Sequence, residues 1–563
     1  MRTRALSAVL TAVLTAVLGT AGCSVFTRPA QPEGDHEPAP VARVVTAAPG
    51  ERLTLIPEAA PVASAVSASR ALFDTAEVAV LVRDGDAAGT LLGASTAVAL
   101  GVPLLVAPPD EDPAAGVVAD ELHRLAAETV LAIGTAGDGS GKRRGGPEIL
   151  GVPAAPDAVE AVTGVDFTAG EQVAPGDEAA AVARLDPGAP AALQPQDAEA
   201  PAAPGEPDHA SLPKVARADS RSGTLLVSDG GPETLAGIAT ALAAGARVEL
   251  TAGGTDPRGS ADVVAALSEA DPESVVVLGK ALASERGLDW KLRVAATGVQ
   301  LPGGGQLLFP GRLLVALYGH PGSAALGVLG EQGIDASIQR ARDHAAAYES
   351  LVDTPVVPAF EIIATVASSA PGPDGNYSAE ADVADLRPWV EAAGAAGLYV
   401  VLDLQPGRSD FVTQAEWFRS LLEVPYVGLA LDPEWRLTPN QVHLSQIGSV
   451  GIDEVNRVVT WLADLTREKA LPQKLLVLHQ FKLAMLPGRE RLDTSRDELA
   501  VLLHADGQGT QGDKQATWRA LHQGAPAAVP WGWKNFYDED APMLTPEQTI
   551  AQVVPTPSLI SYQ

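Results

Sequence analysis

Short apolar runs alternate with amphipathic segments from Arg312 to the end of the chain. Apolar runs of this length predict buried strands, and a recurrence of apolar residues every three to four positions predicts helices between them. The predicted strands are 313–319, 356–367, 398–404, 426–432, 474–481, 499–506, 527–533 and 558–562. The predicted helices are 324–348, 383–395, 413–422, 452–469, 513–521 and 546–553, with at most a short helix in 487–497. Eight strands within about 250 residues predict a closed (β/α)₈, or TIM-like, barrel over residues 305–563.

A second alternating pattern precedes the barrel and occurs twice. The first copy has predicted strands at 78–82, 102–107 and 130–134, with helices at 87–100 and 114–127. The second copy has predicted strands at 224–231, 246–254 and 274–280, with helices at 234–244 and 261–270. The same spacing separates Asp84 from Asp229 and Gly134 from Gly279, which indicates an internal duplication. We therefore expect an α/β protein in which a duplicated βαβαβ parallel-sheet region, 67–285, with a disordered insertion near 185–213, precedes the barrel.

The duplicated unit resembles the cell wall-binding repeat of bacterial surface proteins. The first copy has the T-A opening at Thr75, the D-A helix start at Asp86, the G-x-P-L-L strand from Gly101 and the V-x-x-I-G strand from Val130. The second copy lacks the proline after its glycine. The resemblance implies that this region binds a cell-wall polymer, and a plain α/β scaffold without a binding role is the alternative.

The amino terminus has the order of a bacterial secretion signal. Two arginines are followed by an apolar run over residues 5–18, by small residues and by Cys23, the single cysteine. This order resembles a lipobox, which implies that residues 1–23 are a lipoprotein signal and that Cys23 is lipidated. An ordinary signal peptide with an incidental cysteine is the alternative. Residues 24–66, proline-rich and charged at 28–40, predict a flexible tether, so we expect an extracytoplasmic protein held at the cell membrane by its lipid.

The net charge of the chain limits the kinds of molecule that it is expected to bind. The chain has 563 residues, 39 Lys plus Arg and 70 Asp plus Glu, which gives a formal net charge of −31. A field of this sign repels polyanions and excludes nucleic acid as an expected partner. The length predicts at least two domains.

Polar residues gather at the carboxyl ends of the predicted barrel strands, where chemistry occurs in such barrels. The candidates are Glu361, Asp403, Gln405, Asp432, Glu434, Trp435, His479, Gln480, His504, Asp506, Trp531, Trp533 and Lys534. A two-residue spacing places Asp432 with Glu434, and His504 with Asp506, on one face of a strand. A lone acid at a strand end is commonly a helix cap, but acids at several strand ends predict one site.

Clustered carboxyls suit glycoside hydrolysis, because one acid protonates the leaving oxygen while another stabilises the oxocarbenium-like carbon. The D-x-E of Asp432 and Glu434 is similar to that of chitinase-like and lysozyme-like barrels, which implies that Glu434 is the proton donor. Asp432 or Asp403 would support it, and the other candidates would bind substrate, the tryptophans through flat apolar faces. The longer D-x-x-D-x-D-x-E run is absent, so substrate-assisted chemistry is not implied.

We therefore expect a glycosidase-like barrel that acts, without a cofactor, on a cell-wall polysaccharide or peptidoglycan. A non-catalytic glycan-binding protein that uses the same groove is the alternative. His479 and His504 with nearby acids are ligand types that suit zinc or manganese, but no H-x-H or H-E-x-x-H spacing is present, so no metal is expected.

Overall fold

The computed structural model describes residues 41–563 except 110–111, 113, 140, 143–145 and 197–210. Residues Val41–Gln563 form one compact unit. The predicted signal, the lipidation site Cys23 and the first part of the predicted tether lie outside the described residues. Within the described residues, every helix is too short or too polar to span a bilayer.

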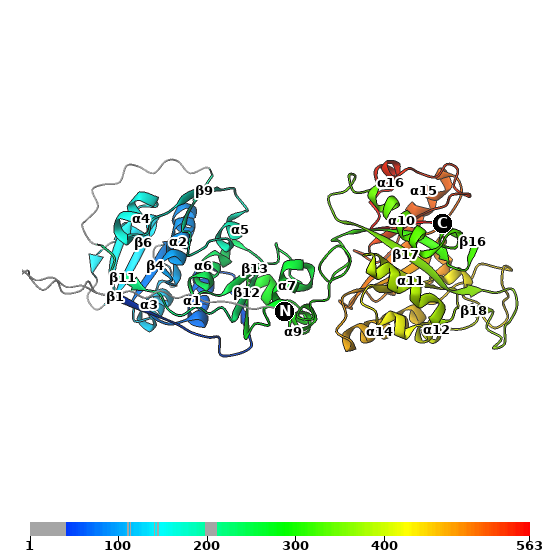
Figure 1. The fold of residues 1–563 in the computed structure, drawn as a ribbon, viewed down its shortest axis with the longest axis horizontal. Coiled ribbons are helices and arrows are strands. Elements are labelled where there is room, and N and C mark those ends of the chain that lie inside the picture. Colours follow the sequence, from blue (N-terminus) through cyan, green and yellow to red (C-terminus); the bar gives the residue numbers. More distant parts are fainter. Residues whose placement is uncertain (1–40, 110–111, 113, 140, 143–145, 197–210) are drawn as a thin grey trace, which may run out of the picture. The chain divides into compact units, whose positions relative to one another are not determined.

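The first copy of the duplicated region forms a sheet in the order β5-β4-β6-β8-β7 (Figure 1). Its strands are β4 (Val78–Arg83), β5 (Leu104–Ala107), β6 (Thr129–Ile133), β7 (Gly141–Lys142) and β8 (Glu148–Val152), and its helices are α2 (Ala87–Leu100) and α3 (Ala115–Arg124). All strands are parallel except β7. Asp86 caps α2 by accepting from the Gly89 amide, which satisfies a free donor of the first turn.

The second copy repeats this arrangement in the all-parallel order β13-β12-β14-β2. Its elements are β12 (Thr224–Ser228), α6 (Leu235–Ala243), β13 (Arg247–Leu250), α7 (Ala261–Glu269) and β14 (Ser274–Leu278). Corresponding strands occupy corresponding places in the two sheets, as the duplication predicts. The expectation of parallel βαβ sheets in this region is confirmed.

Two expectations for the flanking segments differ from the structure. Within the predicted tether, residues 41–66 contain β1 (Val41–Thr46), β2 (Leu53–Ile56) and the start of α1 (Pro61–Leu72). The short strand β2 is stable there because it fills the edge of the second sheet beside β14. Within the predicted disordered insertion, β10 (Ala191–Pro195) pairs with β9 (Ala169–Val173), and the Leu193 amide donates to Ser95 of α2. The remaining described elements of this region are β3 (Phe73–Ala76), α4 (Pro156–Thr163), α5 (Glu178–Ala183), β11 (Lys214–Ala216), α8 (Lys280–Ala283) and α9 (Leu288–Ala295).

Eight parallel strands close into a barrel in residues 305–563, all of which are described. In ring order they are β15 (Leu313–His320), β17 (Val356–Ala367), β19 (Tyr399–Leu404), β20 (Val427–Leu431), β21 (Lys474–Gln480), β22 (Leu499–Ala505), β23 (Trp531–Asn535) and β24 (Leu559–Tyr562). The ring closes because β15 pairs with both β17 and β24. The predicted (β/α)₈ barrel is confirmed.

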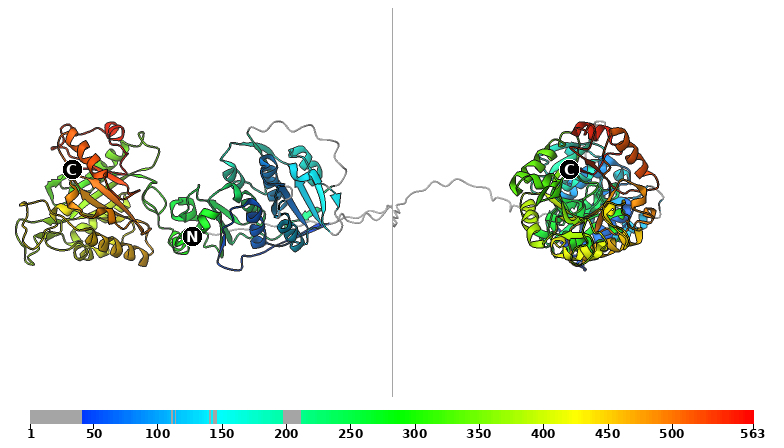
Figure 2. Two further views of the ribbon diagram at one scale, coloured as in Figure 1. Left: turned by 180° about the vertical axis from the view of Figure 1, so that it is seen from behind. Right: turned by 90° about the vertical axis from the view of Figure 1, so that its right-hand side faces the viewer.

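Helices surround the strands (Figure 2, right). They are α10 (Ile334–Ala346), α11 (Val383–Ala395), α12 (Phe411–Trp417), α13 (Arg419–Leu422), α14 (Ile452–Glu468), α15 (Gln511–His522) and α16 (Pro546–Gln552), and the short strand β18 (Ser378–Glu380) extends β17. The helix predicted over 324–348 is wrong in its first part, where β16 (Ser323–Gly327) returns along β15. This return needs glycine, since a Cβ on Gly327 would lie 2.6 Å from the Tyr318 carbonyl oxygen.

The barrel has one apolar core inside the ring and another between the ring and the helices. The inner core contains Leu314, Ala316, Val357, Ala359, Val401, Leu475, Val477 and Leu502. These residues alternate along each strand with members of the outer core. Because strand side chains point alternately to the two faces, this alternation fixes which later residues on each strand face the interior.

We predict that Gly532→Ala destabilises the barrel by about 1–3 kcal/mol, the usual cost of overpacking. A Cβ at Gly532 would lie 2.5 Å from His504 Cδ2, so the imidazole has to shift. Urea unfolding measures the change. Gly512→Ala on α15 is the control, because its Cβ would meet only Thr510 Oγ1, at 3.7 Å. Equal unfolding midpoints for the two variants would contradict the packing argument.

Candidate functional site

The inward-facing positions of the barrel strands change from apolar to polar at the carboxyl ends. After the inner core residues of each strand, the next inward positions are Tyr318, Glu361, Asp403, His479, His504, Lys534 and Ser561. Each of these residues comes two positions after an apolar or glycine position on the same face. Asp432 and Asp506 follow directly after β20 and β22, and Glu434 comes two residues after Asp432. We call Glu361, Asp403, Asp432, Glu434, His479, His504, Asp506 and Lys534 the mouth cluster.

His479 is the centre of the mouth cluster. Its Nε2 lies 2.8 Å from Glu361 Oε1, and its Nδ1 lies 3.0 Å from Asp506 Oδ2. Both ring nitrogens therefore face carboxylates from other strands. Burial alone would lower the pKa of His479, but the charge of Glu361 and the hydrogen bond with Asp506 raise it well above its ordinary value. The reciprocal effects lower the pKa of Glu361 and of Asp506, despite the opposing effect of burial.

Asp403 is held on the opposite side of the same space. It is fully buried, accepts a hydrogen bond of 2.9 Å from Tyr318 Oη, and has its Oδ1 3.9 Å from His479 Nε2. Burial, reinforced by the charge of Glu361, raises the pKa of Asp403 to about 6. Gln405 lies on the same face of β19, where its Nε2 is 3.5 Å from Tyr318 Oη and its Oε1 accepts from the Ala367 amide.

The sequence predicted Asp432 and Glu434 on one face of a strand. In the structure they instead belong to a 3₁₀ turn over Pro433–Trp435, which Asp432 caps. Asp432 begins this turn and accepts from the Glu434 amide at 3.3 Å. Asp432 is buried, whereas Glu434 is half-buried. Burial first, and then the charge of Asp506, raises the pKa of Glu434 to about 7. Burial and the charge of Glu434 raise the pKa of Asp432 well above its usual range.

Lys534 supplies positive charge to this acidic space. Its Nζ lies 3.5 Å from the centre of the Tyr318 ring. Its backbone carbonyl accepts from Lys514 Nζ, which also pairs with buried Asp540 at 2.6 Å and so fixes the end of β23. The mouth cluster thus contains five carboxyl groups, two imidazoles and one ammonium group, drawn from five strands and from the segments that follow β20 and β22.

Three candidate binding residues face away from this space. Trp531 and Trp533 pack against Trp518 of α15, each with a ring-centroid distance of 5.6 Å, and Trp531 also stacks on His522 at 3.7 Å. Gln480 accepts from Arg489, which also donates to the Leu521 carbonyl. Each lies on the face of its strand that is opposite to His479 or Lys534, so these predicted substrate-binding residues do not share the space of the mouth cluster.

Trp435 has a different environment. It follows Glu434 directly, is half-buried and stacks on His443 at 4.7 Å with an interplanar angle of 15°. It remains a candidate platform beside Glu434. Tyr318 and Ser561 were not among the residues predicted from the sequence, and they contact Asp403 and His504 respectively. Both are inward polar residues at strand ends, so the period-two rule applied to the first and last strands would have found them.

We predict that Tyr318→Phe lowers the free energy of unfolding by about 1.5–3 kcal/mol, the range for a hydrogen bond to a charged group. The loss of the Tyr318 hydroxyl also raises the pKa of Asp403 further, because the hydrogen bond it donates lowers that pKa. Denaturant unfolding at neutral pH measures the first effect. Tyr377→Phe is the control, since the Tyr377 ring is covered by Arg408, at 4.2 Å, and stays in place. A Tyr318→Phe protein as stable as the control would refute this role.

No family model matches the chain, and no curated protein matches its sequence. Among solved structures, Cwp8 from Clostridium difficile matches with 14% identity over 44% of this chain and 52% of its own length, at a TM-score of 0.30. Cwp6 from Clostridium difficile matches with 11% identity over 69% of this chain and 66% of its own length, at a TM-score of 0.27. The chain thus spans about half the length of Cwp8.

Proposed function

We propose that the barrel is a glycoside hydrolase that acts on a cell-envelope polysaccharide, with Glu434 as the proton donor. The observation that supports this most is the pKa of about 7 for Glu434, a half-buried carboxyl among other acids. A general acid is most effective when its pKa lies near the working pH. Partial exposure matters equally, because a glycosidic oxygen of a polymer has to reach the proton.

The neighbouring carboxyl groups Asp403 and Asp432 have different roles in the proposed reaction. Asp403 has a pKa of about 6, so it is ionised at neutral pH and stabilises the positive charge that develops on the anomeric carbon. Burial and the charge of Glu434 raise the pKa of Asp432 well above its usual range, which favours its protonated form, and Asp432 accepts from the Glu434 amide in the turn. Different environments thus give three carboxyls of one site different protonation states.

The rest of the chain suits attachment to the cell envelope. We propose that lipidated Cys23 anchors the protein on the outer side of the membrane and that the duplicated region, residues 67–285, binds a cell-wall polysaccharide or peptidoglycan. A diacylglycerol anchor supplies two acyl chains, which suffice for stable attachment. The substrate polymer and the proposed attachment polymer then lie within reach of the same tethered chain.

We predict that Glu434→Gln lowers kcat on the polysaccharide substrate by about 10²–10⁴-fold, the typical contribution of a general acid. Release of reducing ends from purified cell-wall polysaccharide measures turnover, and co-sedimentation with the same material measures binding. Glu349→Gln, an exposed glutamate after α10, is the matched control and retains full activity.

Retained binding with lost turnover supports the hydrolase. Full turnover by Glu434→Gln would remove Glu434 as the acid. A parent chain that binds the polysaccharide but cleaves no wall polymer would show a non-catalytic glycan-binding protein instead.

We predict a bell-shaped dependence of kcat/KM on pH with its maximum between the pKa of Asp403, about 6, and the pKa of Glu434, about 7. The rate falls above the higher value because Glu434 loses the proton that it must donate. It falls below the lower value because Asp403 becomes neutral and no longer stabilises positive charge. In Asp403→Asn the acidic limb should disappear while the basic limb stays. Rates that rise steadily through pH 8 would contradict the assignment of Glu434.

A further inference from the structure

Several buried polar atoms at the centre of the barrel have no hydrogen-bond partner among the described residues. They include Glu361 Oε2, Asp403 Oδ1 and His504 Nδ1, whose side chains are fully buried. Leaving such atoms unpaired in a buried site is costly, and more so for charged groups. Orphaned atoms of this kind point to a missing ligand, and here three of them surround one space.

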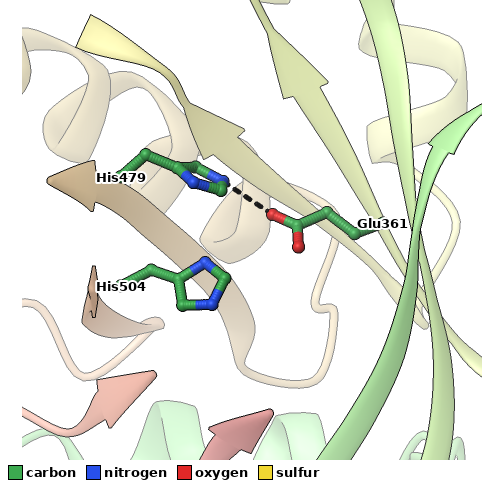
Figure 3. A group of neighbouring side chains, drawn as sticks. All are labelled: Glu361, His479 and His504. Atoms are coloured by element: carbon green, nitrogen blue, oxygen red, sulfur yellow. Dashed lines mark hydrogen bonds and ion pairs between the residues drawn. The ribbon is translucent and has the colours of Figure 1, made fainter. Parts of the chain in front are cut away.

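The ligand atoms converge from two adjacent strands, β21 and β22, and from β17 across the ring. One atom each from Glu361, His479 and His504 lies within 4.8 Å of the other two. Figure 3 shows both imidazoles beside the Glu361 carboxylate, which reaches them from another strand. His479 and His504 are register partners on adjacent strands, with ring centroids 4.8 Å apart.

Each imidazole also has its second nitrogen held by an oxygen atom. His479 Nδ1 lies 3.0 Å from Asp506 Oδ2, and His504 Nε2 lies 3.1 Å from Ser561 Oγ. When these oxygens accept from the ring N–H groups, His479 Nε2 and His504 Nδ1 are the nitrogens that face the shared space. Histidines that ligate metals almost always have such an acceptor on the other nitrogen, which fixes the tautomer and the ring orientation.

We propose that Glu361, His479 and His504 form a binding site for one divalent first-row transition metal ion. Two imidazole nitrogens with a carboxylate oxygen suit zinc, manganese or iron, and no sulfur ligand lies among them. Binding replaces the proton between His479 Nε2 and Glu361 Oε1, and this proton leaves to solvent. The ion's two positive charges would offset part of the excess of carboxylates, which includes Asp403, whose Oδ1 is 3.9 Å from His479 Nε2.

The proposal does not depend on glycoside hydrolysis, and zinc binding tests it directly. The full-length protein, stripped with EDTA and dialysed, is titrated with zinc sulfate by calorimetry, and its metal content is measured by mass spectrometry. We expect one zinc per chain and a thermal transition that rises with zinc concentration, because a ligand of the folded state stabilises it. With cobalt, we expect the visible absorption of an ion bound by imidazoles.

His504→Gln should lose the one equivalent of zinc and the cobalt spectrum, whereas His522→Gln, on the outer helix α15, should keep both. Ser561→Ala is the milder variant, for which zinc affinity should fall by about 10–100-fold as for other outer-shell partners. Circular dichroism shows whether each variant folds. A parent chain that binds no zinc, or a folded His504→Gln or Ser561→Ala that binds zinc as the parent does, would overturn the site. Glu434→Gln should bind zinc normally, so a failure of the hydrolase and a failure of the metal site give different results.

Discussion

The register of the closed barrel is the constraint on which the site depends. In a strand, successive side chains alternate between the two faces, and ring closure between β15 and β17 leaves each strand one inner and one outer face. Apolar residues fill the inner positions first, and polar residues occupy the last inner position of most strands. A slip of one residue in β17 would move Glu361 into the helix layer and Phe360 into the mouth. The apolar layers below therefore determine where the acids lie.

Burying the charged groups of the mouth cluster is unfavourable, and the ion pairs among them offset only part of the desolvation free energy. Placing a charge in a poorly hydrated interior costs several kcal/mol, and a buried ion pair is weak evidence of added stability. His479 offsets part of this cost by facing Glu361 and Asp506 together. The barrel gains its stability from the two apolar cores on either side of the strands. The five carboxyls and two imidazoles at one end of the barrel therefore contribute little to its stability, which is consistent with the binding and catalytic roles that we propose for them.

The strands and helices of the barrel were predictable because apolar runs and helical periodicity are both local features of the sequence. The bounds of β17 and α11 follow from the apolar run at 356–367 and the periodic segment at 383–395 alone. Which side chains point into the barrel and which point to the helices was not predictable in the same way. A barrel strand is buried on both faces, so hydrophobicity does not reveal which face is inner. Trp531 and Trp533 share a face by their spacing, but only the ring shows that this face meets Trp518 rather than His504.

Pairing between strands far apart in the sequence explains other differences between the predicted and the observed elements. The segment containing β2 has no strong strand pattern, and its order comes from β14, which lies more than two hundred residues later. The turn at Asp432 is a similar case, since a run of apolar residues predicts the strand but not where it ends. Proline at position 433 starts the 3₁₀ turn, because its fixed φ suits a first helical position. The acids at 432 and 434 were thus correctly placed at a strand end, but their relative orientation comes from the turn.

That turn separates two kinds of carboxyl in one cluster. Glu361 and Asp506 face His479, which favours their ionised forms and holds them at fixed positions. Glu434 has no such partner in the part of the chain that the structure describes, and it stands one turn beyond the strand, where burial and like charges favour its protonated form while its exposure remains partial. An acid placed on the strand itself would be as deeply buried as Asp403, which is 0% exposed. The proton donation that we propose requires both a retained proton and contact with a polymer, and Glu434 on the turn combines a raised pKa with partial exposure.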